Sequence, residues 1–594
     1  MNNTHQISPP RVLPLLTAII ATLAAGLLPS AAAGPRIDPD TGRPLDNQPP
    51  PRHVDLLHLD LTLDLGDLST DTADALAVID LQAVGSPRDT ITLDAVGLEV
   101  IAVTIDDRPV AHETTPTHLR ILPDQPLQPG VPTRVAIDYH IPSMTNAGFG
   151  LSWSARKPGG ISKTDRRPQI HAQGQSQFNS RWFPSRDAPD ERLTSTMRVT
   201  APADFTVVSN GDLTSRIESP DDRVRWTWEQ SEPHPVYLVT LAVGHYETIE
   251  VGGPTSARPG LAMPAYTPVG TARRAQAKLE KTAEMIAFLE AYLDEPYPWQ
   301  QYGQVFCRDF RWGGMENTGA TVLREDILFA GPRAHDALIM HEVAHQWLGN
   351  LVTCHSWEHL WLNEGWAVFA ELLWLEYASN PVERQAAIVD ELTSWRDHLA
   401  SVGPLTAPDD PAMRTPYFSH PDDIFEQADD PYLKGAYVLH MLRNKLGDSL
   451  FRDVAIAWID THKHGSADTE DFRRVAERVS GRSLERFFDQ WVDRPGLPRI
   501  TATPAHTRLD DGSHILTLKL TQTQHIDRLN AAYHITVPVT VELDDGSRRT
   551  MEIPMHTRAR TYTIGLDTAP RRILVDPIAS HHPAHDTTPN SRAR

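Results

Sequence analysis

The sequence of 594 residues has little cysteine, no excess of positive charge and few long apolar runs, and each shortage excludes a class of protein. Cys307 and Cys354, the only two cysteines, are too few for a disulfide framework or a cysteine-based structural zinc site. The net charge of −22 argues against a nucleic-acid partner, which needs clustered Lys and Arg. An acidic surface suits a soluble protein and mildly favours cationic ligands.

One apolar run, residues 12–28, lies close to the N-terminus. It follows Arg11 and precedes three alanines at 31–33, a pattern typical of a cleaved export signal. The run includes Pro14 and is short for a membrane span. We therefore expect residues 1–33 to be a signal peptide and the protein to be periplasmic or extracellular, with an uncleaved membrane anchor as the alternative. No later stretch is apolar enough to cross a bilayer, so no stable span is expected after signal cleavage.

Hydrophobic periodicity predicts an α+β multidomain protein. Residues 34–52 are rich in Pro, Asp and Gly and are predicted to be a linker. Alternating leucines then begin a predicted N-terminal β domain over residues 53–250. These leucines are Leu57, Leu59, Leu61, Leu63 and Leu65.

Helical spacing replaces this alternation near residue 270, and a first helix is expected over residues 272–293. Residues 251–497 are therefore predicted to be a mainly helical domain with a small sheet at its front. Alternation returns after Pro498, which predicts a small β-sandwich over residues 498–577. The polar residues 578–594 are predicted to be a disordered tail.

A metal-binding pattern occurs at His341-Glu342-Val343-Ala344-His345. Two histidines four positions apart on a helix project from one face, so their imidazoles can converge on one ion. Glu364 follows His345 by 19 positions and can supply a third ligand from a neighbouring helix. Two imidazoles and a carboxylate, with one position left open, are the ligands of a catalytic zinc. The alternatives are two solvated histidines and a first-turn glutamate favoured by the helix dipole.

This ligand set predicts hydrolysis. Zinc activates a water molecule and polarises a carbonyl group. Glu342 lies beside the ligands and can act as the general base, which then delivers the proton to the leaving amine. The oxyanion that forms needs a hydrogen-bond donor beside the metal.

The sequence resembles the aminopeptidase N family of zinc metallopeptidases, which also includes leukotriene hydrolase. The resemblance covers about residues 50–577 and depends on three motifs. They are His341-Glu342-x-x-His345 with Glu364, Gly313-Gly314-Met315-Glu316-Asn317, and Tyr432-Leu433-Lys434-Gly435-Ala436. The family implies a thermolysin-like catalytic domain, one zinc ion per chain, and peptide substrates with a free amino terminus.

The resemblance also implies roles for individual residues. Glu316 is expected to bind the α-amino group of the substrate, with help from Gln175. Tyr432 is expected to donate a hydrogen bond to the oxyanion. Gly313, Gly314 and Met315 are expected to line the peptide, because glycine lets another backbone approach closely. As single residues, Glu316 could be a solvated loop acid, Tyr432 a packing residue and Gln175 a surface amide.

One feature differs from many family members. The chain ends after the predicted β-sandwich, so no large C-terminal helical domain is expected, and the active site is expected to be more open or closed by another subunit. The two cysteines are expected near the catalytic centre, either bridged in an oxidising compartment or as two small buried residues. The oligomeric state and the preferred N-terminal residue cannot be read from the sequence.

We therefore expect a zinc-dependent aminopeptidase that hydrolyses the N-terminal peptide bond. Within the same family, an endopeptidase or an epoxide hydrolase is the alternative. A non-catalytic peptide-binding scaffold is disfavoured, because the ligands, the base and the tyrosine are all present.

Overall fold

The computed structural model describes residues 52–144, 148–154, 167–252, 257–331, 335–401, 412–416, 418, 420–425, 427, 429–526, 531–575, 586–587 and 590–591. The predicted signal peptide lies outside these residues, and so does the predicted linker except for Arg52. The chain divides into two compact units, which are described separately. One comprises Gly34–Asn380 and Pro404–Leu497, and the other comprises Met1–Ala33, Pro381–Gly403 and Pro498–Arg594.

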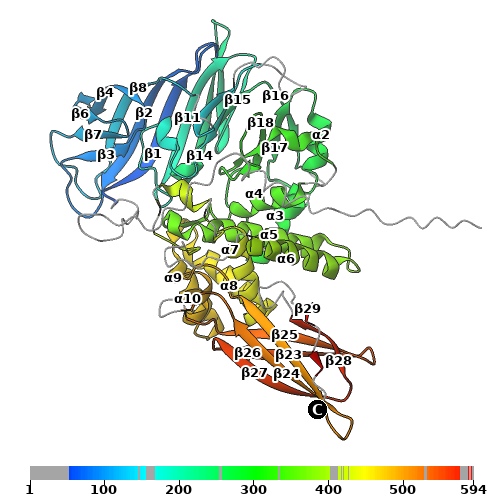
Figure 1. Cartoon of the computed structure of the whole chain (residues 1–594). Coiled ribbons are helices and arrows are strands. Elements are labelled where there is room, and N and C mark those ends of the chain that lie inside the picture. The colour runs from blue at the N-terminus through cyan, green and yellow to red at the C-terminus, as the bar shows by residue number, and fades with distance from the viewer. Residues whose placement is uncertain are drawn as a thin grey trace, which may run out of the picture. The chain divides into compact units, whose positions relative to one another are not determined.

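The N-terminal part of the first unit is built on a large mixed sheet, coloured blue to cyan in Figure 1. Its order is β13-β14-β11-β1-β2-β8-β4-β5, and β1 is parallel to β11 but antiparallel to β2. The strands are β1 (Val54–Asp64), β2 (Ala73–Ala83), β4 (Glu99–Ile105), β5 (Arg108–Pro109), β8 (Thr133–Ile141), β11 (Arg192–Pro202), β13 (Asp212–Ser219) and β14 (Arg223–Pro235).

Strand β1 shows how the sequence pattern forms the core. Leu59, Leu61 and Leu63 are buried, as the alternation predicts. A β-bulge between Leu56 and His58 shifts the phase, so that Leu56 is buried and Leu57 is only partly buried. A bulge adds one residue to a strand, so residues before and after the bulge differ by one position in which face of the sheet they occupy.

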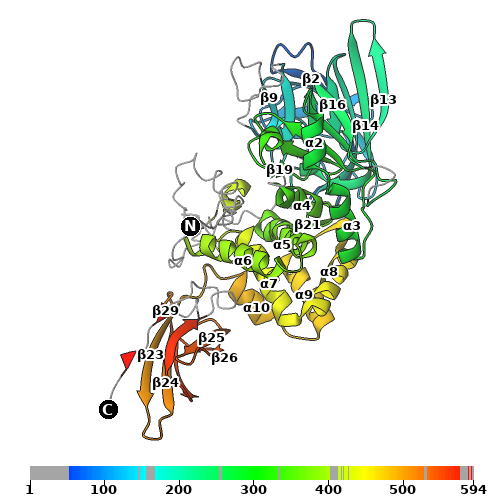
Figure 2. The same ribbon diagram turned by 90° about the vertical axis from the view of Figure 1, so that its right-hand side faces the viewer.

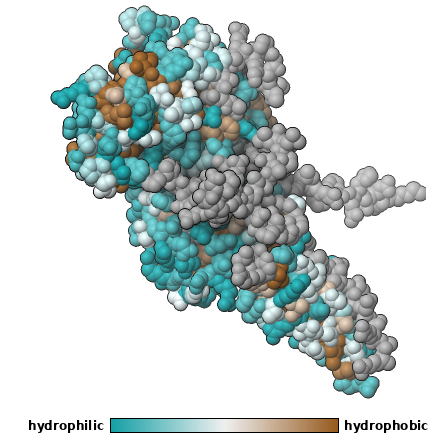
Figure 3. All heavy atoms as spheres, turned by 60° about the vertical axis from the view of Figure 1, so that its left-hand side comes forward, coloured by the Kyte–Doolittle hydropathy of each residue, from teal (hydrophilic) through white to brown (hydrophobic). Residues whose placement is uncertain are grey.

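Two smaller sheets complete this part of the molecule. One has the order β12-β15-β10-β9, with β9 (Gly150–Ser154), β10 (Gln169–Gln173), β12 (Thr206–Ser209) and β15 (Leu241–Gly244). The other has the order β3-β7-β6, with β3 (Ile91–Asp94), β6 (Ala111–Thr114) and β7 (His118–Leu122). Figure 3 shows that the face in view is mainly hydrophilic, with apolar residues gathered over the N-terminal β domain.

The helical part begins with a sheet of order β16-β17-β18-β20-β19. Its strands are β16 (Tyr246–Glu250), β17 (Pro264–Pro268), β18 (Gly303–Cys307), β19 (Gly314–Met315) and β20 (Ala320–Arg324). Helices α2 (Ala272–Lys278) and α3 (Thr282–Leu293) lie between β17 and β18 in sequence. After β20 come α4 (Asp336–His345), α5 (Trp361–Ala378), α7 (Leu433–Leu446), α8 (Asp448–His462), α9 (Thr469–Ser480) and α10 (Glu485–Trp491), and Figure 2 shows α5 and α7 to α10 below these sheets. A small two-stranded sheet joins β21 (Val352–Cys354) to β22 (Gly465–Ala467).

Two predicted regions differ in detail from the structure, and one helix was not predicted. The helix expected over residues 272–293 is two helices, because the chain leaves helical geometry between α2 and α3. Near the end of the predicted β domain, the chain forms the 3₁₀ helix η2 (Val236–Leu238) before β15. Helix α6 (Arg384–Ser401) was not predicted.

The second unit contains α6 and a β-sandwich. One sheet has the order β27-β24-β23-β30 and the other β26-β25-β28-β29. The strands are β23 (Ile500–Arg508), β24 (His514–Gln522), β25 (Ile535–Leu543), β26 (Arg548–Met555), β27 (Ala559–Leu566), β28 (Pro570–Val575), β29 (Asp586–Thr587) and β30 (Asn590–Ser591). The last two lie within residues 578–594, which the sequence predicts to be disordered.

The predicted fold class is confirmed: an N-terminal β domain, a mainly helical domain and a C-terminal β-sandwich, without a large C-terminal helical domain in the described residues. Among the described residues, every helix is too short or too polar to cross a membrane.

Candidate metal centre and active site

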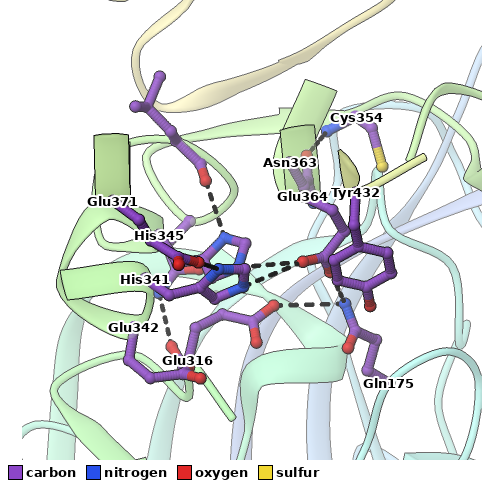
Figure 4. Close-up of polar contacts among 12 residues, drawn as sticks. Gln175, Glu316, His341, Glu342, His345, Cys354, Asn363, Glu364, Glu371 and Tyr432 are labelled. Atoms are coloured by element: carbon purple, nitrogen blue, oxygen red, sulfur yellow. Dashed lines mark hydrogen bonds and ion pairs between the residues drawn. The ribbon is translucent and has the colours of Figure 1, made fainter. Parts of the chain in front are cut away.

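The metal centre is built by helices α4 and α5, which pack against each other. His341 and His345 lie one turn apart near the end of α4, and their Nε2 atoms are 3.1 Å apart. Glu364 lies in the first turn of α5 and places its Oε2 atom 3.3 Å from each of these nitrogens. Figure 4 shows the three side chains pointing toward a common centre.

The donor set fits a zinc ion. The three donor atoms form a triangle with sides of 3.1–3.3 Å, the spacing expected of ligands bound about 2.0–2.2 Å from one ion. Each imidazole is also held from behind: His341 Nδ1 donates to Glu371 Oε1 at 2.8 Å, and His345 Nδ1 donates to the Leu348 carbonyl at 3.0 Å. These bonds leave both Nε2 lone pairs free to face the metal position.

A glycine contact brings α7 against α5. A Cβ atom added to Gly365 would lie 2.8 Å from the Cα atom of Gly435, and one added to Gly435 would lie 2.9 Å from the Cα atom of Gly365. Only glycine at both positions allows the two backbones to touch in this way. The contact brings Tyr432, which immediately precedes α7, close to Glu364.

The position of Tyr432 is fixed by hydrogen bonds to the main chain at the start of α7 and by a nearby ion pair. Asp430 Oδ1 accepts hydrogen bonds from the amides of Tyr432, at 2.8 Å, and Leu433, at 3.2 Å. Lys434 and Asp429 form a buried ion pair at 2.6 Å, which anchors the start of α7. The Tyr432 ring lies nearly parallel to the His341 imidazole, with 6.4 Å between their centroids. Figure 4 shows the tyrosine beside Glu364.

Glu342 and Gly314 lie in direct contact. A Cβ atom added to Gly314 would lie 2.2 Å from Glu342 Oε1, so only glycine lets β19 approach this carboxylate. The other carboxylate oxygen of Glu342, Oε2, has no hydrogen-bond partner although it is buried. The close approach therefore confines Glu342 between the strand and the metal ligands.

Strand β19 has a free edge, because it is the last strand of its sheet. The Arg324 amide donates to the Gly313 carbonyl at 3.0 Å, and Gly314 lies opposite Leu323. Since antiparallel hydrogen-bonded pairs alternate with non-bonded pairs, the amide and carbonyl of Gly314 point toward the free edge. Met315 is buried in the core beneath the strand.

Gln175 joins Glu316 to the metal ligand Glu364. Its Nε2 atom donates to Glu316 Oε1 at 3.3 Å and to Glu364 Oε1 at 3.2 Å, and all three side chains are buried. The main chain of Glu316 is also held: its carbonyl accepts hydrogen bonds from Gln346 at 3.1 Å and from Asn350 at 2.8 Å. Gln346 and Asn350 follow His345 in sequence, so Glu316 is tied to the end of the helix that carries the histidines.

Burial and the histidines set the charge on these carboxyl groups. Burial raises the pKa of Glu364, but His345 and His341 outweigh burial and hold this pKa at about 2. Burial raises the pKa of Glu342 to about 8, against the opposing effect of the two histidines. Burial, with the nearby Glu364, also raises the pKa of Glu316. One carboxylate is therefore kept ionised by the histidines, and the others favour a neutral form or a cationic partner.

The structure thus brings together most of the site residues named from the sequence: the two histidines, Glu342, Glu364, Glu316, Gln175, Tyr432, Gly313 and Gly314. The Met315 side chain, which was expected to line the peptide, is instead buried in the core beneath β19. Sequence analysis missed Glu371, although it follows Glu364 by seven residues and therefore lies on the same face of α5. It also gave no role to Asn363, whose side chain accepts a hydrogen bond from the Cys354 amide at 3.0 Å.

Cys307 and Cys354 are both buried free thiols. The Tyr246 hydroxyl lies 3.7 Å from Cys307 Sγ. The structure therefore contradicts the bridged alternative and agrees with two small buried residues.

An edge strand beside two helices that present two histidines and a glutamate defines a metallopeptidase-like class of protein. Residues 51–238 match the Peptidase M1 N-terminal domain, and residues 277–491 match the Peptidase family M1 domain. Together the matches cover more than half of the chain. The chain belongs to peptidase family M1.

Known relatives support this assignment. Aminopeptidase M1-D of Oryza sativa subsp. japonica is 30% identical over 354 residues, which are 57% of this chain and 39% of the relative. Probable aminopeptidase 1 of Sulfurisphaera tokodaii is 25% identical over 477 residues, which are 78% of this chain and 56% of the relative. The chain therefore spans only part of the length of these relatives.

The fold is also similar to solved structures. A mutant of the M1 zinc metallopeptidase from Deinococcus radiodurans, bound to a Tyr-Ser-Ala substrate, aligns with a TM-score of 0.61 and 24% identity. The alignment covers 75% of this chain and 96% of that chain.

Proposed function

We propose that the protein is a zinc-dependent aminopeptidase that removes the first residue of peptides with a free amino terminus. The observation that carries this proposal is the bridge made by Gln175 between Glu316 and the metal ligand Glu364, at 3.3 and 3.2 Å. A carboxylate that can bind an ammonium group therefore lies beside the metal position. This spacing favours cleavage of the first peptide bond.

His341, His345 and Glu364 would hold one zinc ion per chain, which supplies Lewis-acid activation of water and of the scissile carbonyl. Glu342 would take the proton of the attacking water and deliver it to the leaving amine. Tyr432 would donate its hydroxyl proton in a hydrogen bond to the developing oxyanion.

Glu316 would select substrates with a free amine. It is buried, and burial raises its pKa, so its ionised form is costly without a cationic partner. A substrate ammonium supplies that partner, whereas an acetylated amino group does not. Gln175 would accept a second hydrogen bond from the same amine through its amide oxygen. The free edge at Gly314 would pair with the peptide backbone.

The predicted export signal adds a location to this proposal. If residues 1–33 are removed on export, the enzyme acts on peptides in the periplasm or outside the cell. Comparing the N-terminus of the protein recovered from the periplasm with that of the protein retained in the cytoplasm tests this part separately.

The proposed activity is tested with aminoacyl arylamides, with and without an N-acetyl group, before and after removal of metal by a chelator. We expect hydrolysis of the free substrates only, loss of activity on chelation, and recovery with zinc. Equal cleavage of free and acetylated substrates would refute the role of Glu316 as the amine anchor.

A further inference from the structure

A cluster of aromatic rings and guanidinium groups lies next to the segments expected to bind the peptide. Phe149 packs against Phe178, with ring centroids 4.2 Å apart, and against Trp312 at 5.4 Å. The Arg181 guanidinium stacks on Phe178 at 5.0 Å, and the Arg311 guanidinium lies 5.6 Å from the rings of both Phe149 and Trp312. We call these five residues the arginine–aromatic cluster.

Within the part of the chain that the structure describes, neither of the two guanidinium groups forms an ion pair with an acid. Among the ion pairs of the described residues, none involves Arg181 or Arg311, although the chain has 77 acidic and 55 basic residues. Arg311 is exposed and Arg181 is partly exposed. Stacking uses the flat face of a guanidinium and leaves its N–H edges available for a planar anion. Each of these guanidinium groups can therefore offer its N–H edges to a carboxylate.

The cluster adjoins both segments that are expected to contact the peptide. The Phe178 amide donates to the Gly174 carbonyl at 2.9 Å, which places Phe178 one turn beyond Gln175. Trp312 immediately precedes Gly313 and the free edge of β19. A Cβ atom added to Gly150 would lie 2.9 Å from Arg181 Cβ, so the small residue in β9 allows this arginine to pack closely.

The direction of β19 fixes which part of a peptide would meet the cluster. With the amino group at Glu316 and the first peptide bond at the metal position, later residues run along the edge strand toward Gly313 and Trp312. Arg311 precedes Glu316 by five positions, a span of at most about 17 Å. An extended tripeptide is about 10 Å long, and an arginine side chain adds several more ångströms of reach. The carboxylate of a short peptide therefore falls within range.

We propose that the arginine–aromatic cluster binds a carboxylate of the peptide downstream of the cleaved bond. This carboxylate is either the C-terminus of a short peptide or an acidic side chain. The inference rests on the proposed function, because it takes the amine position from Glu316. It predicts a preference for short or acidic peptides that the metal centre alone would not produce.

The test measures peptide binding to a zinc-loaded E342Q variant by calorimetry, so that it does not depend on turnover. The ligands are a tripeptide acid, its C-terminal amide, and a pair of tetrapeptide amides with Asp or Asn at the third position. The acid and Asp ligands are expected to bind roughly tenfold more tightly than their neutral partners, as charged hydrogen bonds do. The two pairs distinguish the C-terminal carboxylate from an acidic side chain.

Adding R181A and R311A together should abolish this discrimination, and R311K should reduce it because lysine lacks the planar fork. The matched control is R274A, since Arg274 also stacks on a ring, that of Phe329 at 5.2 Å, in another part of the domain. Three results would overturn the proposal. The tighter binding of acidic ligands could survive in R181A/R311A, it could be absent from E342Q itself, or it could be lost to the same extent in R274A. Hydrolysis of aminoacyl arylamides, which carry no carboxylate, should persist in R181A/R311A on a wild-type background, and its absence in wild type would refute the proposed function separately.

Discussion

The metal centre and the arginine–aromatic cluster lie on either side of strand β19 in sequence, yet they are built in opposite ways. The ligands of the metal centre come from two helices, and each of its imidazoles has a second partner, Glu371 or the Leu348 carbonyl. The cluster draws its five residues from three separate segments. Among the described residues, no acid forms an ion pair with either of its arginines.

This difference in construction suits the metal centre to catalysis and the cluster, as proposed, to substrate selection. Buried groups held on both sides keep one geometry, which a reaction at a metal requires. Exposed groups on an aromatic platform can adapt to different peptides and contribute to binding. Substitutions in the metal centre should therefore abolish turnover, and those in the cluster should change only which peptides bind.

The largest effect is expected from removing a metal ligand. E364Q removes the anionic ligand from the triangle of donor atoms, so zinc content should fall and kcat/KM should drop by about 10³-fold or more. Metal analysis and arylamide hydrolysis measure both quantities. The matched control is E376Q on the same helix, where Glu376 pairs with Arg443 at 2.8 Å. Full zinc occupancy in E364Q would contradict the assigned ligand set.

A methyl group at Gly314 should have the next largest effect. In G314A the new Cβ would overlap Glu342 Oε1, since the two positions are only 2.2 Å apart. Displacement of Glu342, the proposed general base, should lower kcat by about 100-fold while zinc stays bound. G331A serves as the control, because a Cβ at Gly331 meets no atom within 4 Å. Unchanged kcat in G314A would show that Glu342 is not confined by the strand.

A smaller effect is expected behind the metal ligands. E371Q weakens the acceptor that holds His341 through the 2.8 Å hydrogen bond. Zinc affinity should fall about 10- to 100-fold, with activity restored by excess zinc. A competition titration against a zinc-binding dye measures the change. If the affinity matches that of E376Q, Glu371 does not orient the histidine.

The smallest effect on catalysis is expected at His234, which lies outside both regions. Burial, with a contribution from Arg192, lowers the pKa of His234 to about 3, and neither ring nitrogen has a partner. Below about pH 6.5, His234 therefore binds a proton in the unfolded chain but stays neutral in the folded protein. The free energy of unfolding consequently falls as the pH drops from about 6.5 toward 3. At pH 5 this one group costs about 2 kcal/mol.

H234L removes that cost without losing a hydrogen bond. Its melting temperature should fall less than that of the wild type between pH 7 and pH 5, while arylamide hydrolysis at pH 7 is unchanged. The control is H112Q, because His112 in β6 is only partly buried. An identical pH dependence in H234L and wild type would contradict the buried neutral imidazole.

The sequence predicts the metal centre well because its ligands come from a local pattern. His341 and His345 share a helix face, and Glu364 begins the next helix, so spacing alone brings them within reach. Glu371 could have been found by the same periodicity. The N-terminal and C-terminal β domains were predicted from alternation, with errors where a bulge or a 3₁₀ helix shifts the phase, as at Leu56 and Val236.

The arginine–aromatic cluster could not be predicted in this way. Phe149, Phe178 and Trp312 are separated by long stretches of chain, and their contact depends on how three strands and loops pack. The Gly365–Gly435 contact could not be predicted either, because nothing in the sequence around either glycine indicates that the other packs against it. Such tertiary contacts require the fold.

The central claim is that one buried site binds zinc through Glu364 and the two histidines and binds the free amino group of the substrate through a separate carboxylate, Glu316. The most direct test compares zinc content and the kcat/KM ratio of free to N-acetylated substrate in wild type and E316Q. We predict that E316Q retains zinc and loses most of the preference for the free amine, by about 100-fold or more, because a buried ammonium loses its partner. An E316Q variant that keeps the wild-type ratio would contradict the claim.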